Sequence, residues 1–118
     1  MDLSRFSRSE MLIGGESVEK LSRCHVAVFG LGGVGSWCAE ALCRSGVGTL
    51  YLLDQDTVSL SNVNRQLFAL TSTLDLPKAE AAAARLRDIA PESRMQGVIL
   101  SETARRPRYG GRTHFCGK

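Results

Sequence analysis

The sequence predicts an α/β fold of the Rossmann-like, doubly wound type with a mostly parallel sheet. Three observations predict it. A glycine-rich turn follows an apolar run, a second apolar run ends at an acidic residue, and strand-like and helical segments alternate along the 118 residues. Only the N-terminal part of such a fold is expected, because three apolar strands would leave a face and an edge of the sheet uncovered.

The expected core elements follow the order strand, helix, strand, helix, strand. The first strand is a continuous apolar, β-branched run, as expected of a strand buried on both faces. Apolar residues at helical spacing predict the first helix, which ends at glycines, and alanines between two prolines predict the second. The third strand is interrupted by Gly97. In chain order these elements cover residues 25–30, 33–48, 49–54, 71–91 and 94–100.

Two further segments have simpler patterns. Residues 9–21 predict a short helical region that Gly14 and Gly15 interrupt. Residues 59–67 are polar, and Ser59 or Ser61 can cap a short helical turn there.

Composition points to a cytoplasmic protein. No run of eighteen apolar residues and no secretory signal is present, so we expect no membrane association. The four cysteines lack CxxC spacing, and we expect no metal ligands among them. The net charge of +3 arises in residues 104–118, which contain basic residues and no acidic ones.

The glycine-rich turn carries the strongest chemical signal. Its glycines, in a GxGxxG pattern, follow a strand and open a helix. Glycine permits the tight turn and lets backbone N–H groups approach a phosphate, while the helix N-terminus adds partial positive charge. A merely tight turn is the alternative. The nucleotide-binding candidates in this turn are Gly30, Gly32, Gly33 and Gly35.

An acidic residue ends the second strand. Asp54 lies where a carboxylate accepts hydrogen bonds from the ribose hydroxyls of an adenine nucleotide. Asp56 is either a second ligand or a residue that caps the loop. These features alone fit an NAD-dependent enzyme equally well.

Polar and basic residues beyond the acid favour ATP. Asn62, Arg65 and Lys78 follow Asp54 within about 25 residues. A dinucleotide has no need of two extra cations here, whereas a triphosphate accumulates charge on its outer phosphates. The alternatives are a surface ion pair for Arg65 and a solvated first-turn lysine for Lys78.

The segments AVFGLGGVGS, LLDQDTVSLSNVNRQL and PKAE resemble the ThiF-type family of adenylating enzymes, which is related to ubiquitin-activating enzymes. The resemblance covers roughly residues 5–92. Within the family, RFSRSEMLIG, GVGSW and NVNRQL are most similar to the tRNA threonylcarbamoyladenosine dehydratases.

The resemblance implies roles for the candidates. The glycine loop and Asp54 would bind ATP, with Asn62 beside the triphosphate. Arg65 and Lys78 would act in catalysis. Arg8 would reach the active site of the other subunit of a homodimer.

The implied reaction is ATP-dependent cyclisation of N6-threonylcarbamoyladenosine in tRNA, a dehydration through an acyl-adenylate. Mg²⁺ would be held by an aspartate of a later strand, beyond residue 118. The alternatives are an adenylyltransferase that activates the C-terminus of a ubiquitin-like sulfur-carrier protein, and a non-catalytic nucleotide-binding or dimerisation module.

The last residues do not resemble the family. We expect residues 1–102 to form the N-terminal part of the nucleotide-binding domain and residues 103–118 to be an irregular basic tail. The abrupt change to Arg, Pro and Gly suggests a truncated or frame-shifted reading, and hence an inactive fragment. An RNA-contacting arm is the alternative for this tail.

Overall fold

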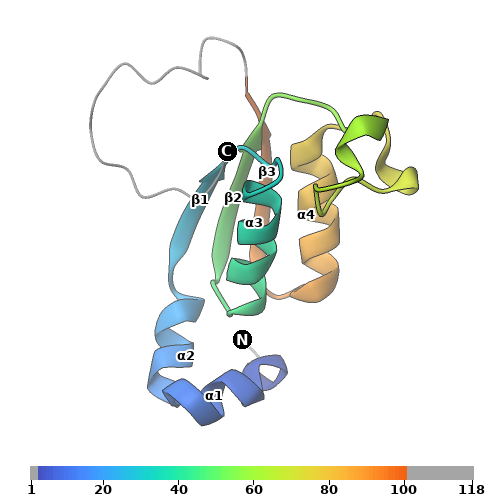
Figure 1. Cartoon of the computed structure of the whole chain (residues 1–118). Coiled ribbons are helices and arrows are strands. Elements are labelled where there is room, and N and C mark those ends of the chain that lie inside the picture. The colour runs from blue at the N-terminus through green and yellow to red at the C-terminus, as the bar shows by residue number, and fades with distance from the viewer. Residues whose placement is uncertain (1–2, 101–118) are drawn as a thin grey trace.

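A computed structural model describes residues 3–100 and contains a parallel three-stranded sheet. Its strands β1 (His25–Phe29), β2 (Thr49–Asp54) and β3 (Arg94–Ile99) lie in the order β1-β2-β3. Helix α3 (Gly35–Arg44) connects the first two strands, and helix α4 (Lys78–Ile89) precedes the third (Figure 1). This arrangement confirms the predicted α/β class and its N-terminal, half-sheet extent. The predicted tail lies outside the described residues.

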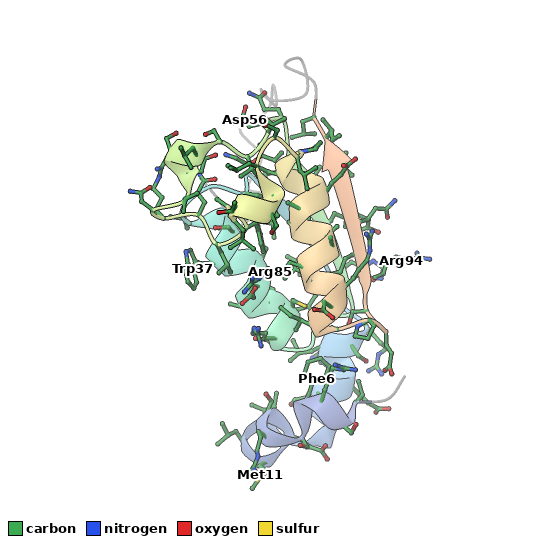
Figure 2. All side chains as sticks on the ribbon, turned by 90° about the vertical axis from the view of Figure 1, so that its right-hand side faces the viewer. Phe6, Met11, Trp37, Asp56, Arg85 and Arg94 are labelled. Carbon is green, nitrogen blue, oxygen red and sulfur yellow. The ribbon has the colours of Figure 1, made fainter. Side chains whose placement is uncertain are left out.

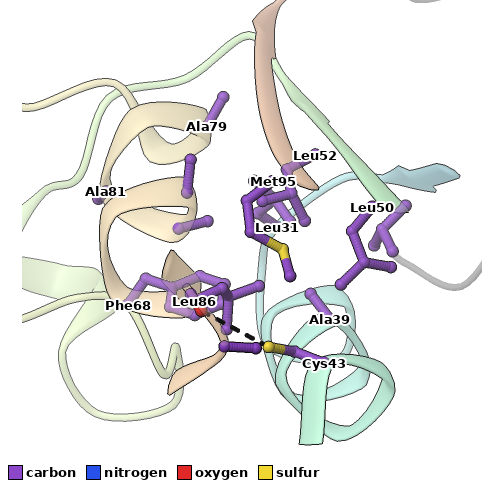
Figure 3. Packing of buried hydrophobic residues seen from close by; sticks show 14 of the residues in the cluster. Leu31, Ala39, Cys43, Leu50, Leu52, Phe68, Ala79, Ala81, Leu86 and Met95 are labelled. Atoms are coloured by element: carbon purple, nitrogen blue, oxygen red, sulfur yellow. Dashed lines mark hydrogen bonds between the residues drawn. The ribbon is translucent and has the colours of Figure 1, made fainter. Parts of the chain in front are cut away.

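Both connecting helices cover the same face of the sheet. Parallel strands joined by right-handed crossovers in one direction place their helices on one side. Val28, Leu50, Leu52 and Met95 point from the sheet into this layer, where they meet small side chains of α3 and α4 and the larger Leu86 (Figure 3). The small side chains let the helices approach the sheet closely.

The opposite face of the sheet is uncovered within residues 3–100. The pattern of β1 is typical of a strand buried on both faces, but among residues 3–100 only Val28 of this strand is fully buried and Phe29 is exposed. This agrees with the expectation that three strands leave one face of the sheet uncovered. Val98 of β3 lies on the same face of the sheet as Phe29 and is also exposed. An apolar run indicates a strand but does not reveal which helices will cover it.

Gly97 does not interrupt the third strand but lies in its middle. A Cβ atom at this position would lie 2.7 Å from the carbonyl oxygen of Ala79 in α4. The glycine therefore marks the point where the backbone of α4 crosses closest to β3.

The N-terminal residues form two short helices at the amino ends of the strands (Figure 1). Helices α1 (Ser7–Ile13) and α2 (Gly15–Ser22) are separated at Gly14, whose φ of +87° favours glycine, so the predicted interruption is confirmed. Phe6 is buried against Gly46, and the Arg5 guanidinium donates to the carbonyl of Ile89 over 2.9 Å. These contacts attach the N-terminal segment to the far ends of α3 and α4.

The loop between β2 and α4 contains the short 3-10 helices Leu60–Asn62 and Thr71–Thr73. The helix predicted within 71–91, with Pro77 at its start, is confirmed: α4 begins at Lys78 directly after Pro77, which also pairs with Thr57 in an isolated β-bridge. Within the described part of the chain, no helix is long and apolar enough to cross a membrane.

Glu40 joins α3 to α4 through Arg85 and also pairs with Arg44 of its own helix. Its carboxylate accepts from the Arg85 side chain at 2.5 Å and from Arg44 at 3.1 Å. Burial alone would raise the pKa of Glu40, but the hydrogen bonds from Arg85 and Arg44 outweigh it and hold the pKa below its usual value. Nearby, burial raises the pKa of Cys43 to about 11, so this thiol stays protonated at neutral pH; it donates to the Leu86 carbonyl (Figure 3).

Glu40→Gln should lower the free energy of unfolding at pH 7 by about 1–2 kcal/mol, because both arginines lose a charged acceptor but remain partly solvated. Because the pKa of Glu40 is lower in the folded than in the unfolded protein, its ionised form stabilises the fold when the pH lies above the unfolded-state pKa. This stabilisation is lost as the pH falls through the folded-state pKa. The difference between wild type and variant in urea unfolding should therefore shrink below about pH 4.5. Glu92→Gln, at an exposed acid of the turn between α4 and β3, is the control and should change stability by less than about 0.5 kcal/mol. An equal effect of both substitutions would contradict this account.

Candidate nucleotide-binding site

The glycine loop leaves β1 and opens α3 at the carboxyl edge of the sheet (Figure 1). Gly30 has a φ of +87°, a conformation that glycine adopts readily, and its N–H donates to the Leu53 carbonyl at 2.8 Å. The chain then turns away from the sheet, and α3 begins at Gly35. The predicted strand–glycine turn–helix unit is thus present.

The loop exposes a set of backbone donors with no partner. Among residues 3–100 no hydrogen bond is donated by the N–H groups of Gly32, Gly33, Val34 and Gly35. The positive end of the α3 dipole lies at the same place. Converging free N–H groups at a helix N-terminus form an anion-binding site suited to phosphate.

Asp54 connects this loop to the end of β2. One carboxylate oxygen accepts from the N–H of Leu31 at 2.6 Å, and the other accepts from the N–H of Asp56 at 2.8 Å. The side chain is 8% exposed, and each oxygen retains acceptor capacity after one bond. Asp54 is thus positioned beside the loop, as a ribose ligand requires. Asp56 is exposed, and its backbone bonds within the loop.

Arg65 lies against the glycine loop. A Cβ at Gly33 would be 3.7 Å from the Cγ and Cδ atoms of Arg65. The guanidinium donates to the Ser61 carbonyl and the Asn64 side chain, at 3.1 and 2.9 Å. Arg65 has no carboxylate partner in the described part of the chain, so the alternative of a surface ion pair is not observed.

Lys78 occupies the first position of α4 and is only 7% exposed. Its backbone N–H donates to the Asp56 carbonyl at 3.0 Å, which brings the start of α4 to the edge where Asp54 lies. Its side chain makes no ion pair within residues 3–100. Lys78 is therefore less exposed than a fully solvated first-turn lysine, and a cation at a helix N-terminus is favoured only with an anion nearby.

Asn62 has a structural partner. Its side-chain oxygen accepts from the N–H of Ser59 at 2.9 Å, in a capping box around the 3-10 helix Leu60–Asn62. Ser59, rather than Ser61, thus occupies the N-cap position of this turn. The bond leaves the amide NH₂ of Asn62 as a donor.

Arg8 is the candidate that the structure does not bring to the others. It lies exposed on α1, at the amino end of the sheet, whereas the glycine loop lies at the carboxyl end (Figure 1). Residues 3–100 contain no cluster of three or more His, Cys, Asp or Glu side chains that could hold a metal ion.

Two residues at this edge had no assigned role in the sequence analysis. Ser36 is fully buried at the start of α3, and Trp37 donates its indole N–H to the carbonyl of Arg65 at 3.1 Å. In the sequence, Ser36 is typical of a residue at the start of a helix, and Trp37 fits the apolar spacing of that helix. Neither feature indicates a hydrogen bond to the loop about 30 residues later in the chain.

A phosphate-binding turn that opens a helix, with an acid at the end of the neighbouring parallel strand, defines a nucleotide-binding α/β domain. The chain belongs to the ThiF family, whose sequence model matches residues 6–106. The match continues past residue 92, where we expected the resemblance to end, and so includes β3.

Individual relatives agree with this assignment. The chain is 56% identical over 90 residues to tRNA threonylcarbamoyladenosine dehydratase of Bacillus subtilis (strain 168), covering 76% of this chain and 35% of the relative. It is 38% identical over 99 residues to the sulfur carrier protein ThiS adenylyltransferase of Escherichia coli (strain K12), covering 82% and 39%. The E. coli tRNA N6-threonylcarbamoyladenosine dehydratase in complex with ATP matches with a TM-score of 0.79 and 44% identity, covering 81% and 40%. The chain thus spans 35–40% of the length of these proteins.

Asp54→Asn should weaken ATP binding by about tenfold or more, because one oxygen that could serve the ribose becomes an NH₂ group facing a backbone donor. Asp56→Asn removes an equal charge two residues away, at an exposed position, and should change affinity less than about twofold. Calorimetric titration with ATP measures both, after urea unfolding has shown that each variant is folded. Equal affinity of wild type and Asp54→Asn would contradict the ribose role.

Proposed function

We propose that this chain carries the ATP-binding part of an enzyme that adenylates and cyclises N6-threonylcarbamoyladenosine in tRNA. The observation that carries the proposal is the pairing of four free loop N–H groups with two cations that lack carboxylate partners within residues 3–100, Arg65 and Lys78. A triphosphate supplies the anions for both sets. The tRNA substrate rests on the likeness to relatives of that name, which are 45–56% identical over the aligned parts.

The chemistry requires little covalent participation by the protein. A carboxylate oxygen of the threonylcarbamoyl group attacks the α-phosphorus of ATP, the bond to the β-phosphate breaks, and pyrophosphate leaves. An internal attack on the resulting acyl-adenylate then expels AMP, and loss of a proton completes the ring. Overall the substrate loses the elements of water.

The residues of this chain act on charge and position. The loop N–H groups and α3 dipole hold phosphate oxygens, and Asp54 orients the ribose. Arg65 and Lys78 offset the negative charge that develops on the transferred and leaving phosphates. Mg²⁺ would add to this charge neutralisation; the described residues offer no acidic cluster to hold it, so no step is assigned to it.

Two other functions remain as alternatives. A sulfur-carrier adenylyltransferase would use the same nucleotide site with a protein C-terminus as the carboxylate; the lower identity of 38% to such an enzyme disfavours it. A non-catalytic nucleotide-binding module would use the loop and Asp54 but have no need of two cations at the phosphates.

Arg65→Ala and Lys78→Ala should each reduce adenylation by about 100-fold, because each removes one positive charge from the site of the triphosphate. ATP–pyrophosphate exchange with tRNA bearing threonylcarbamoyladenosine measures this. Lys20→Ala, at an exposed lysine of α2, is the control and should exchange at the wild-type rate. Exchange supported only by a sulfur-carrier C-terminus would favour the first alternative, and ATP binding without exchange would favour the second.

Arg8 is proposed to act in the site of a partner subunit, since it lies at the far end of its own sheet. Arg8→Ala and Lys78→Ala should each be inactive alone as symmetric dimers. Mixing them should restore up to about a quarter of wild-type exchange, because half of the dimers are mixed and contain one intact site. No recovery in mixtures shown to exchange subunits would contradict a role in the partner's site.

A further inference from the structure

Two hydrogen bonds connect the start of α3 to residues 65–67, here called the 65–67 segment, and a third connects α3 to the glycine loop. The Ser36 hydroxyl donates to the Gly32 carbonyl at 2.5 Å and accepts from the N–H of Leu67 at 3.1 Å. The Trp37 indole N–H donates to the Arg65 carbonyl at 3.1 Å. Both ends of the segment are therefore bonded to residues of the loop–helix junction.

Side chains of the same segment lie across the loop. The aliphatic part of Arg65 lies against Gly33. The side-chain nitrogen of Gln66, a buried residue, would lie 3.8 Å from a Cβ at Gly32. The segment and the free N–H groups of the loop are thus parts of one packed unit.

The exposure of Trp37 indicates that its role is not core packing. The side chain is 57% exposed and lies on the outer side of α3, below the loop that follows β2 (Figure 2). Its partner is the backbone carbonyl of Arg65, so the bond holds the backbone from which the guanidinium extends. Ser36, by contrast, is fully buried and is needed for the local fold.

We propose that Trp37 is a positioning residue for Arg65: its indole N–H sets the place of the Arg65 guanidinium relative to the phosphate-binding N–H groups. The inference rests on the proposed adenylating function. Since a displacement of about 1 Å in a charged group can cost up to about 100-fold in rate, loss of this bond should lower the rate of adenylation more than the affinity for ATP.

The kinetic test is a double-mutant cycle. Trp37→Phe keeps an aromatic ring but removes the donor, and should reduce kcat of ATP–pyrophosphate exchange about tenfold while the Kd for ATP changes less than about twofold. In an Arg65→Lys background, which keeps a charge but not the guanidinium geometry, the same substitution should cost less than about twofold, because the group that it positions is already altered. Val63→Ala, an exposed apolar residue of the same loop, is the control and should match wild type.

A second measurement needs neither a variant nor activity. Trp37 is the only tryptophan of the sequence, so an amide correlation spectrum contains one indole N–H signal. This signal should exchange with solvent at least about tenfold more slowly than that of an unstructured peptide, because its proton is bonded. Rapid exchange, unchanged kcat in Trp37→Phe, or an equal cost in both backgrounds would overturn the proposal. Absence of exchange activity in wild type with a protected indole would overturn the proposed adenylation and leave the bond to Arg65 standing.

Discussion

The Asp54 carboxylate is the interaction on which the nucleotide-binding edge depends. By accepting from Leu31 in the glycine loop and from Asp56 in the following loop, it connects two turns that leave neighbouring strands. The Asp56 carbonyl in turn accepts from the N–H of Lys78 at the start of α4. One buried acid therefore holds in register the phosphate-binding turn, the ribose position and the helix that carries a candidate catalytic cation.

The parallel sheet and its closely packed helices form this nucleotide-binding edge. Parallel strands end at the same side of the sheet, so each strand–helix turn contributes to one surface. Small residues in α3 and α4, with Gly97 in β3, allow the helices to approach the sheet closely, and the Glu40–Arg85 ion pair holds the two helices together. The positive end of α3 and the Lys78 side chain then lie at the same edge of the sheet, where a bound anion interacts favourably with both.

The sequence predicted the elements well because their signals are local. The run TLYLLD coincides with β2, and the GxGxxG turn, Asp54 and Lys78 lie where the pattern indicated. What it could not predict depends on contacts between distant residues. Gly97 was predicted to interrupt the strand, but it lies where the Ala79 carbonyl comes close. Trp37 fitted a helical apolar pattern, which does not indicate its bond to Arg65. The face of β1 that residues 3–100 leave uncovered likewise depends on which helices lie beside it.

The central claim is that the glycine loop is a phosphate site served by free backbone donors. Titration of the isotope-labelled chain with ATP, followed by backbone amide signals, tests it most directly. The account predicts that the largest shifts occur at Gly32, Gly33, Val34 and Gly35, with smaller shifts at Gly30 and Leu31, whose N–H groups already donate within the protein. Saturable ATP binding that leaves these four amides unshifted, or shifts that centre on another surface, would contradict it.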